Sequence, residues 1–106
     1  MSDAVVAVVT FRPLPGRGAE VVELLAPIIA GVHEEPGCLL YALNEASDGS
    51  FWFVEKWATA ADAERHSHAS PALPALAERL SPLLEGMPVI VQGVAHPLGD
   101  PVKGAL

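Results

Sequence analysis

The chain has 106 residues, and its 13 acidic and 6 basic side chains give a formal net charge of −7. This length suits one domain with its own hydrophobic core. An excess of acidic groups repels phosphate backbones, and no stripe of Lys or Arg offsets it. We therefore expect no nucleic-acid partner.

The chain carries a single cysteine, Cys38, which excludes an internal disulfide framework and a cysteine-based zinc site. The apolar run at residues 4–9 is short and lacks the basic flank of a signal peptide. No segment approaches the roughly 20 apolar residues needed to span a bilayer. The sequence therefore predicts a soluble cytoplasmic protein with no membrane partner.

The first third of the chain predicts a strand and a helix. Residues 5–11 are apolar and mostly β-branched, which is typical of a strand, and the Pro/Gly-rich run at 12–16 ends it. From 18 to 35, apolar residues recur at helical spacing. Pro27 lies inside this helix, where it removes one backbone hydrogen bond and is expected to bend the axis.

The middle of the chain predicts a β-hairpin. Residues 38–45 form a second strand and residues 51–57 a third, since both are rich in aromatic or branched side chains. The connecting residues 46–50, Ala-Ser-Asp-Gly-Ser, tolerate the backbone angles of a tight turn. Two strands joined this closely pair antiparallel.

Two helices are predicted after the hairpin. Thr59 is expected to cap the first, with Asp62 three residues on completing a capping-box pattern, and this helix should end near His68. Ser70, followed by a proline, is expected to cap a second helix that continues through Leu84.

A fourth strand is predicted at residues 89–94, and the Pro/Gly-rich tail at 96–106 cannot hold a core. The order is therefore βαββαβ, with the second helical region split in two. This is the ferredoxin-like α+β arrangement, an antiparallel sheet with helices on one face. We expect one domain over residues 1–95, with the tail outside it.

Both faces of this sheet are suited to burial. A sheet covered on one side should alternate apolar and polar residues, yet residues 5–9 read Val-Val-Ala-Val-Val and residues 39–43 read Leu-Leu-Tyr-Ala-Leu. The helices cover one face, so the other needs a partner, most economically a second copy on a two-fold axis. The sequence predicts a homodimer with its sheets face to face. The alternative is a monomer with an exposed apolar patch, which is uncommon.

Several motifs together resemble a known family. The run Glu-Pro-Gly-Cys-Leu-Leu-Tyr at 35–41, Phe-Val-Glu-Lys-Trp at 53–57, His66 and the Ser-Pro pair at 70–71 are similar to the antibiotic biosynthesis monooxygenase (ABM) family over residues 4–95. The resemblance implies a dimeric α+β barrel. It also implies oxidation of a quinol or polyphenolic aromatic by O₂ with no flavin, haem, metal or other cofactor. The protein need only bind the ring, favour its anion and exclude water.

The resemblance points to a small set of site residues. His66 is the expected catalytic base, oriented by Asp62 one turn earlier on the same helix. Trp57 offers a flat wall for ring stacking, and Asn44 a hydrogen bond to a developing oxyanion. The expected substrate-binding residues are Trp57, Asn44, Glu55 and Phe53.

Each role has a structural alternative. Trp57 could fill the core, and Asp62 could simply cap its helix. Strand alternation directs the Glu55 carboxylate at an apolar layer, where it must find a partner or become neutral. That partner could be His66 or Arg65, in an internal structural pair.

A metal site is not expected. His66 and His68 lie two positions apart, so on a regular helix their rings point about 200° apart and cannot share a metal. The two could coordinate a metal with Glu55 only if the helix ended before His66. Metal sites need three or four converging ligands.

The chain departs from two branches of the family. Polyketide oxygenases carry an amide four residues before the tryptophan, a tyrosine six after it and an arginine in the last helix, where this chain has Phe53, Ala63 and Ala77. The haem-degrading branch has a histidine iron ligand where residues 76–78 read Leu-Ala-Glu. Both substrate classes are disfavoured. Two functions remain: a quinol or polyphenol monooxygenase, and a non-catalytic small-molecule-binding or accessory protein of the same fold.

Overall fold

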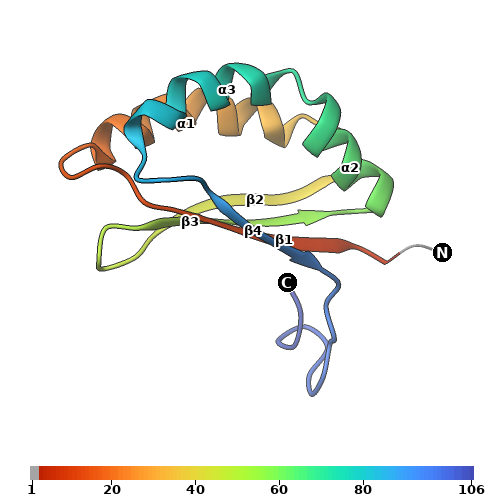
Figure 1. The fold of residues 1–106 in the computed structure, drawn as a ribbon. Helices are drawn as coiled ribbons and strands as arrows, with labels where there is room; N and C mark the ends of the chain where they lie inside the picture. The colour runs from red at the N-terminus through yellow and green to blue at the C-terminus, as the bar shows by residue number, and fades with distance from the viewer. Residues whose placement is uncertain (1–2) are drawn as a thin grey trace.

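The computed structural model describes residues 3–106, which form a four-stranded antiparallel sheet covered on one face by helices (Figure 1). The strand order is β2-β3-β1-β4. This confirms the ferredoxin-like α+β fold. In chain order the elements are β1 (Val5–Phe11), α1 (Gly18–His33), β2 (Cys38–Glu45), β3 (Phe51–Trp57), α2 (Ala60–Ala69), α3 (Ala72–Leu80), the 3₁₀ turn η1 (Ser81–Leu83) and β4 (Val89–Gly93).

Helix α1 contributes much of the core because its apolar residues share one face. It ends at His33, two residues earlier than predicted. Glu35 precedes a proline, and a residue in that position is disfavoured in the helical region. Its fully buried side chains, each worth roughly 1.5–3 kcal/mol of burial, are Val21, Leu25 and Val32.

The second helical region is split, as predicted, but its details differ. The Thr59 hydroxyl accepts a hydrogen bond from the Asp62 amide at 3.1 Å, which confirms the predicted cap of α2. The prediction that Ser70 caps the next helix is wrong, because its hydroxyl donates to Glu35 instead and α3 has no side-chain cap. Helix α3 ends at Leu80 rather than Leu84, and Pro82, which has no amide hydrogen, falls in the 3₁₀ turn that follows.

The face of the sheet opposite the helices is bare and apolar. One row of paired residues crosses all four strands on this face, in the order Ala42, Val54, Val8 and Val91. Val91 is 68% exposed. No helix of the described chain covers this face in Figure 1.

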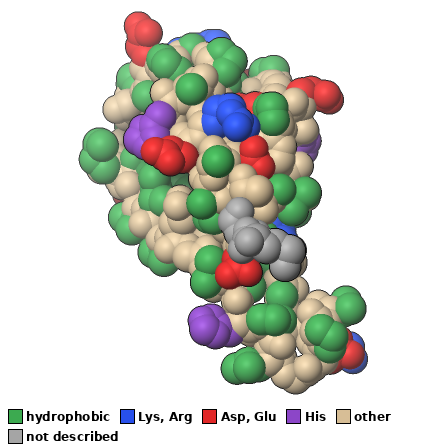
Figure 2. Space-filling view, turned by 90° about the vertical axis from the view of Figure 1, so that its right-hand side faces the viewer, with side chains coloured by type: hydrophobic (Ala, Val, Ile, Leu, Met, Phe, Trp, Pro, Cys, Tyr) green, Lys and Arg blue, Asp and Glu red, His purple; other side chains and the backbone are tan. Residues whose placement is uncertain are grey.

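The segment after β4 leaves the body of the domain on the bare side of the sheet (Figure 1). It forms a lobe with hydrophobic side chains at its surface (Figure 2), including the exposed Leu98 and Val102. The Asp100 carboxylate accepts from the backbone amide of Val102, and the Leu106 carbonyl accepts from the Lys56 ammonium on the sheet. None of the described helices has the length and apolar character to cross a membrane.

Gly37, in the turn between α1 and β2, is expected to tolerate no side chain. Its φ is +78°, and an added Cβ would lie 2.2 Å from the Asp62 carboxylate, which Thr59 and Arg65 hold by hydrogen bonds. We expect Gly37→Ala to lower the free energy of unfolding by about 2–4 kcal/mol.

Gly49 provides the matched control for this variant. Its φ is +89°, but nothing lies within 4 Å of an added Cβ. Gly49→Ala should therefore suffer only backbone strain, about 1–2 kcal/mol. Urea unfolding of both variants gives the comparison. Equal losses would mean that the contact with Asp62 is not a close one.

Candidate functional site

A mostly apolar cavity of about 320 Å³ lies between the sheet and the helices α2 and α3. Aliphatic and aromatic side chains make most of its wall. Cavities of this size and character are the usual form of small-molecule sites. Its few polar lining residues are Tyr41, Glu55, His66, Ser67 and Gln92.

The strand register explains how one wall of the cavity is built. Tyr41 pairs with Glu55, Glu55 with Ala7, and Ala7 with Gln92, so these four residues form one row across the sheet. Side chains at paired positions share a face, and this row faces the helices. Because Ala7 has a small side chain, space remains between Glu55 and Gln92.

His66 enters the cavity wall from α2. Its side chain is only 7% exposed, and its ring stacks on Trp57 with centroids 4.5 Å apart. Nδ1 lies 2.9 Å from a carboxylate oxygen of Glu35. Since a carboxylate only accepts, we assign the proton to Nδ1, which leaves the Nε2 lone pair free.

Glu35 is the partner that the sequence did not reveal. It lies in the turn after α1, and its second carboxylate oxygen accepts a hydrogen bond from Ser70 at 2.6 Å. The Pro-Gly pair that follows it indicates a turn but does not identify the partner of the carboxylate. The turn brings this segment against the start of α2, where the Ala58 amide donates to the Gly37 carbonyl at 2.8 Å.

Glu55 lies on the other side of the His66 ring. Its carboxylate oxygen Oε1 accepts from the Trp57 indole N–H at 3.0 Å and lies 3.9 Å from His66 Nε2. Burial raises the pKa of Glu55, although Trp57 and His66 oppose that shift. Arg65 does not reach it, because the guanidinium pairs with Asp62 at 2.8 Å.

Three of the predicted site residues meet in this cavity, namely His66, Glu55 and Phe53. Trp57 does not line it. At 1% exposure it is part of the core behind His66, where it stacks on the imidazole and donates to Glu55. Trp57 thus supports the site rather than forming its wall.

Asn44 and Asp62 lie away from the position predicted for them. Asn44 lies three positions after Tyr41 on β2, so the two side chains point to opposite faces of the sheet. Asn44 is on the bare face, and its amide donates to the Ala42 carbonyl at 3.3 Å. Asp62 accepts from Thr59 and Arg65 and has no contact with the His66 ring nitrogens. Its role is that of a helix cap, and Glu35 holds His66 instead.

Tyr41 is a cavity residue that sequence reasoning missed. Its ring lies 4.6 Å from that of Phe53 and 5.4 Å from that of His66, between centroids. Burial raises the pKa of the Tyr41 phenol above its ordinary value, with Glu55 adding to the shift. The hydroxyl therefore stays neutral and can donate a hydrogen bond.

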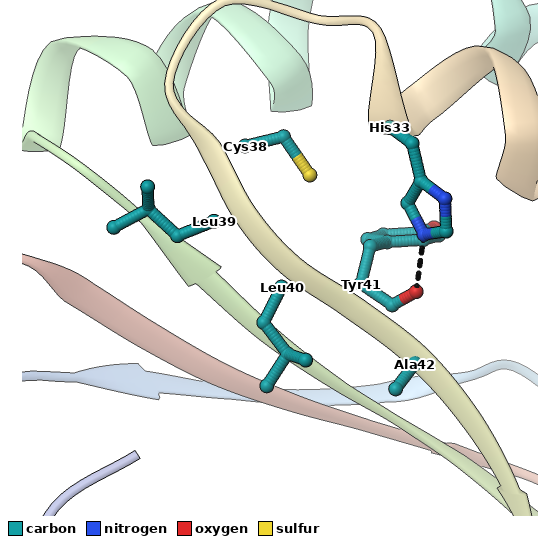
Figure 3. A pocket seen from close by; sticks show the side chains of 6 residues that line it. All are labelled: His33, Cys38, Leu39, Leu40, Tyr41 and Ala42. Carbon is teal, nitrogen blue, oxygen red and sulfur yellow. Dashed lines mark hydrogen bonds between the residues drawn. The ribbon is translucent and has the colours of Figure 1, made fainter.

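A second hollow follows the edge strand β2 and is lined by His33 and Cys38 (Figure 3). His33 Nε2 donates to the Tyr41 carbonyl at 2.9 Å, which occupies that nitrogen. Burial raises the pKa of the Cys38 thiol, and Glu35 and Glu55 add to the shift. A neutral thiol is a poor nucleophile, so this hollow is the weaker candidate for chemistry.

Within residues 3–106 no three His, Cys, Asp or Glu side chains are grouped to hold a metal ion. The two carboxylates beside His66 illustrate why. Glu35 meets Nδ1 and Glu55 faces Nε2, on opposite sides of the ring. Their oxygens do not converge on one point.

Glu55→Gln is expected to change how stability depends on pH. The pKa of Glu55 in the folded protein is raised above its ordinary value of 4.5, so the unfolded chain loses this proton first. The contribution of Glu55 to the free energy of unfolding is fully present below pH 4.5 and is lost as pH rises through the folded-state pKa. Glutamine does not ionise, so residue 55 of the variant adds no such pH dependence. The stability of the variant relative to the wild type should therefore increase between pH 5 and pH 8.

Urea unfolding at several pH values measures this difference. The rest of the chain is identical in the two proteins, so the difference between their pH profiles reports on residue 55. A difference that does not change with pH would show that Glu55 titrates alike in the folded and unfolded chains.

Comparison with known proteins assigns the chain to a family. The sequence profile described as antibiotic biosynthesis monooxygenase matches residues 4–79. Among curated proteins, no significant match was found. A Caulobacter crescentus protein provisionally assigned as an antibiotic biosynthesis monooxygenase has 26% identity and a TM-score of 0.82, over 90% of this chain and 92% of its own.

Two further solved structures agree. A protein of the same provisional assignment from Deinococcus radiodurans has 25% identity and a TM-score of 0.77, over 87% of this chain and 92% of its own. Another from Nitrosomonas europaea shares only 16% identity, so it supports the fold alone, with a TM-score of 0.82 over 93% and 97% of the two chains. The profile match covers most of the chain. The chain therefore belongs to the antibiotic biosynthesis monooxygenase family.

Proposed function

We propose that this protein is a monooxygenase that oxidises a quinol or polyphenolic aromatic with O₂ and uses no flavin, haem or metal. One observation carries the proposal. His66 is fixed by Glu35 so that its free Nε2 lies beside Glu55 in the wall of an apolar cavity. A base held in the wall of a mostly apolar cavity suits a substrate that reacts as its anion.

The proposed reaction begins with proton transfer from a ring hydroxyl to His66 Nε2. The resulting anion is electron-rich and reduces O₂ directly. One oxygen atom enters the ring in place of a hydrogen, and the other leaves as water. For a quinol, four electrons are lost in total and the product is a hydroxylated quinone, so atoms and electrons balance.

The surroundings of His66 support a flat aromatic substrate. Phe53 and Tyr41 supply ring surfaces within the cavity, and aromatic pairs of this kind gain from offset or edge contacts. Ser67 and Gln92 offer hydrogen bonds elsewhere on the wall. Trp57 holds Glu55 and the imidazole in place from behind.

Oxygen uptake tests this proposal. Protein treated with chelator is mixed with anaerobically prepared naphthoquinols or polyphenols and then with O₂, and the rate is compared with buffer and heat-denatured protein. Mass spectrometry after reaction with ¹⁸O₂ should find one labelled atom in the product. A wild-type rate equal to that of buffer for every substrate would remove the proposal.

Ligand binding without turnover is the second candidate. It is favoured by the dense packing of His66, which contacts Trp57 on one side and the edge of Tyr41 on another. Groups packed in this way also stabilise a core. Saturable binding of a quinol, with no oxygen consumed above the buffer rate, would support this function over catalysis.

The bare face of the sheet supports assembly as a homodimer. Val8 and Val91 are exposed there in the same row, and Trp52 and Asn44 pair on that face. A second copy would cover this apolar surface from water. Sedimentation velocity at micromolar concentration measures the mass directly, and a clean monomer would contradict the dimer.

A further inference from the structure

We propose that the cavity selects uncharged hydroxyaromatic compounds, with one ring hydroxyl seated between His66 Nε2 and the Glu55 carboxyl, and that it rejects their carboxylated or phosphorylated analogues. This inference extends the proposed function by naming the substrate class. It concerns binding alone, so it can be tested without turnover.

The distance between His66 Nε2 and the Glu55 carboxyl allows both to bind one hydroxyl group. Nε2 and the Glu55 oxygen Oε1 are 3.9 Å apart, which is too long for a direct hydrogen bond. An oxygen atom beside the pair could lie at about 2.8 Å from both, within the usual hydrogen-bond range. A single hydroxyl oxygen beside the pair can therefore contact both groups.

The hydrogen-bond donor and acceptor at this binding position match a hydroxyl group. Glu35 keeps the proton of His66 on Nδ1, so Nε2 accepts. Burial raises the pKa of Glu55, which favours its protonated form as a donor. A hydroxyl donates once and accepts readily, so it satisfies His66 and Glu55 together. A carboxylate has no proton to give to Nε2.

The distribution of charge around the cavity argues against anions. The two ionisable side chains beside the ring nitrogens of His66 are both glutamates, Glu35 and Glu55. No Lys or Arg lines the cavity within the described residues. The arginines lie elsewhere: Arg12 pairs with Asp48, Arg17 with Glu20 and Arg65 with Asp62, and Arg79 lines a separate surface groove.

An anionic ligand in this cavity would therefore lose its hydration without gaining a cation. It would also be repelled by the Glu35 carboxylate on the far side of the His66 ring. Lost hydration and this repulsion together are expected to weaken binding of an anion about 10-fold or more.

Three redox-stable naphthalenes test this selectivity by calorimetry at pH 7. Methyl 6-hydroxy-2-naphthoate carries the hydroxyl without charge, and 6-hydroxy-2-naphthoate has a similar size with a carboxylate. Methyl 6-methoxy-2-naphthoate blocks the hydroxyl. We expect the hydroxy ester to bind, the acid to bind more weakly than the ester by about 10-fold or more, and the blocked ester to lose about 10-fold or more in affinity.

A reversal by mutation provides the matched control. Gln92 is an exposed residue of β4 that lines the cavity, so substitution there should leave the fold intact. Gln92→Lys places a cation in the wall and should raise the ratio of acid affinity to ester affinity about 10-fold or more. Gln92→Met, of similar length and uncharged, should not.

The outcomes separate this inference from the proposed function. The proposed selectivity would be overturned if the wild type bound acid and ester equally, or if it did not bind the hydroxy ester. Either result would hold whether or not quinols drive oxygen uptake. The expected ranking with no oxygen uptake by quinols would support the selectivity and contradict the monooxygenase.

Discussion

Replacing His66 with alanine is expected to lower quinol-dependent oxygen uptake by about 100-fold or more, because the variant has no base to form the reactive anion. The loss should appear in kcat and shrink as pH rises, since hydroxide then deprotonates the substrate without the enzyme. Oxygen-electrode rates between pH 6 and pH 9 measure both effects. An unchanged rate would exclude His66 as the base.

A second variant separates catalysis from folding. Alanine removes the hydrogen bond that His66 donates to Glu35, so we expect His66→Ala to be less stable than the wild type. In His66→Asn the side-chain amide takes the place of Nδ1 and can donate to Glu35, but no atom replaces Nε2. We expect this variant to remain folded and to lose activity to a similar extent.

His68→Ala is the matched control on the same helix. Its side chain is exposed and has no part in the cavity. We expect wild-type activity and nearly wild-type stability, since exposed substitutions away from caps and packing usually change stability by under about 0.5 kcal/mol. A large loss of oxygen uptake in this variant would indicate that α2 as a whole, rather than the His66 ring, is what matters.

The fold could be predicted from local patterns because each element carries its own signal. The β-branched run of β1 and the helical spacing in α1 are properties of a few neighbouring residues. The ends of the helices were harder to predict. Ser70 followed by proline has the pattern of an N-cap, yet its hydroxyl donates to Glu35, 35 positions away in the chain. A tertiary hydrogen bond of this kind leaves no local pattern.

The candidate site could be predicted only in part for the same reason. Strand alternation correctly directed Phe53 and Glu55 toward the helices. It could also have shown that Asn44 lies on the opposite face from Tyr41, because the two are an odd number of positions apart on one strand. Glu35 could not be assigned to His66 from spacing, since the turn that joins them is a matter of tertiary geometry.

Replacing Trp57 with alanine is expected to lower the free energy of unfolding by about 3–5 kcal/mol, the range for deleting a buried aromatic side chain. Trp57 is the largest fully buried side chain, and its loss also removes the ring on which His66 stacks. For a small domain, whose total stability is about 5–15 kcal/mol, this is a large fraction. Urea unfolding at pH 7 measures it.

Trp57→Phe distinguishes the packing role of Trp57 from its hydrogen bond. Phenylalanine retains a ring against His66 but has no N–H for Glu55, so the buried carboxyl loses its donor at a cost of about 1–3 kcal/mol. That hydrogen bond lowers the pKa of Glu55. Its removal should move the pH range in which stability falls to higher pH. If the free energies of unfolding of Trp57→Phe and the wild type changed with pH in parallel, the indole N–H would have no influence on the ionisation of Glu55.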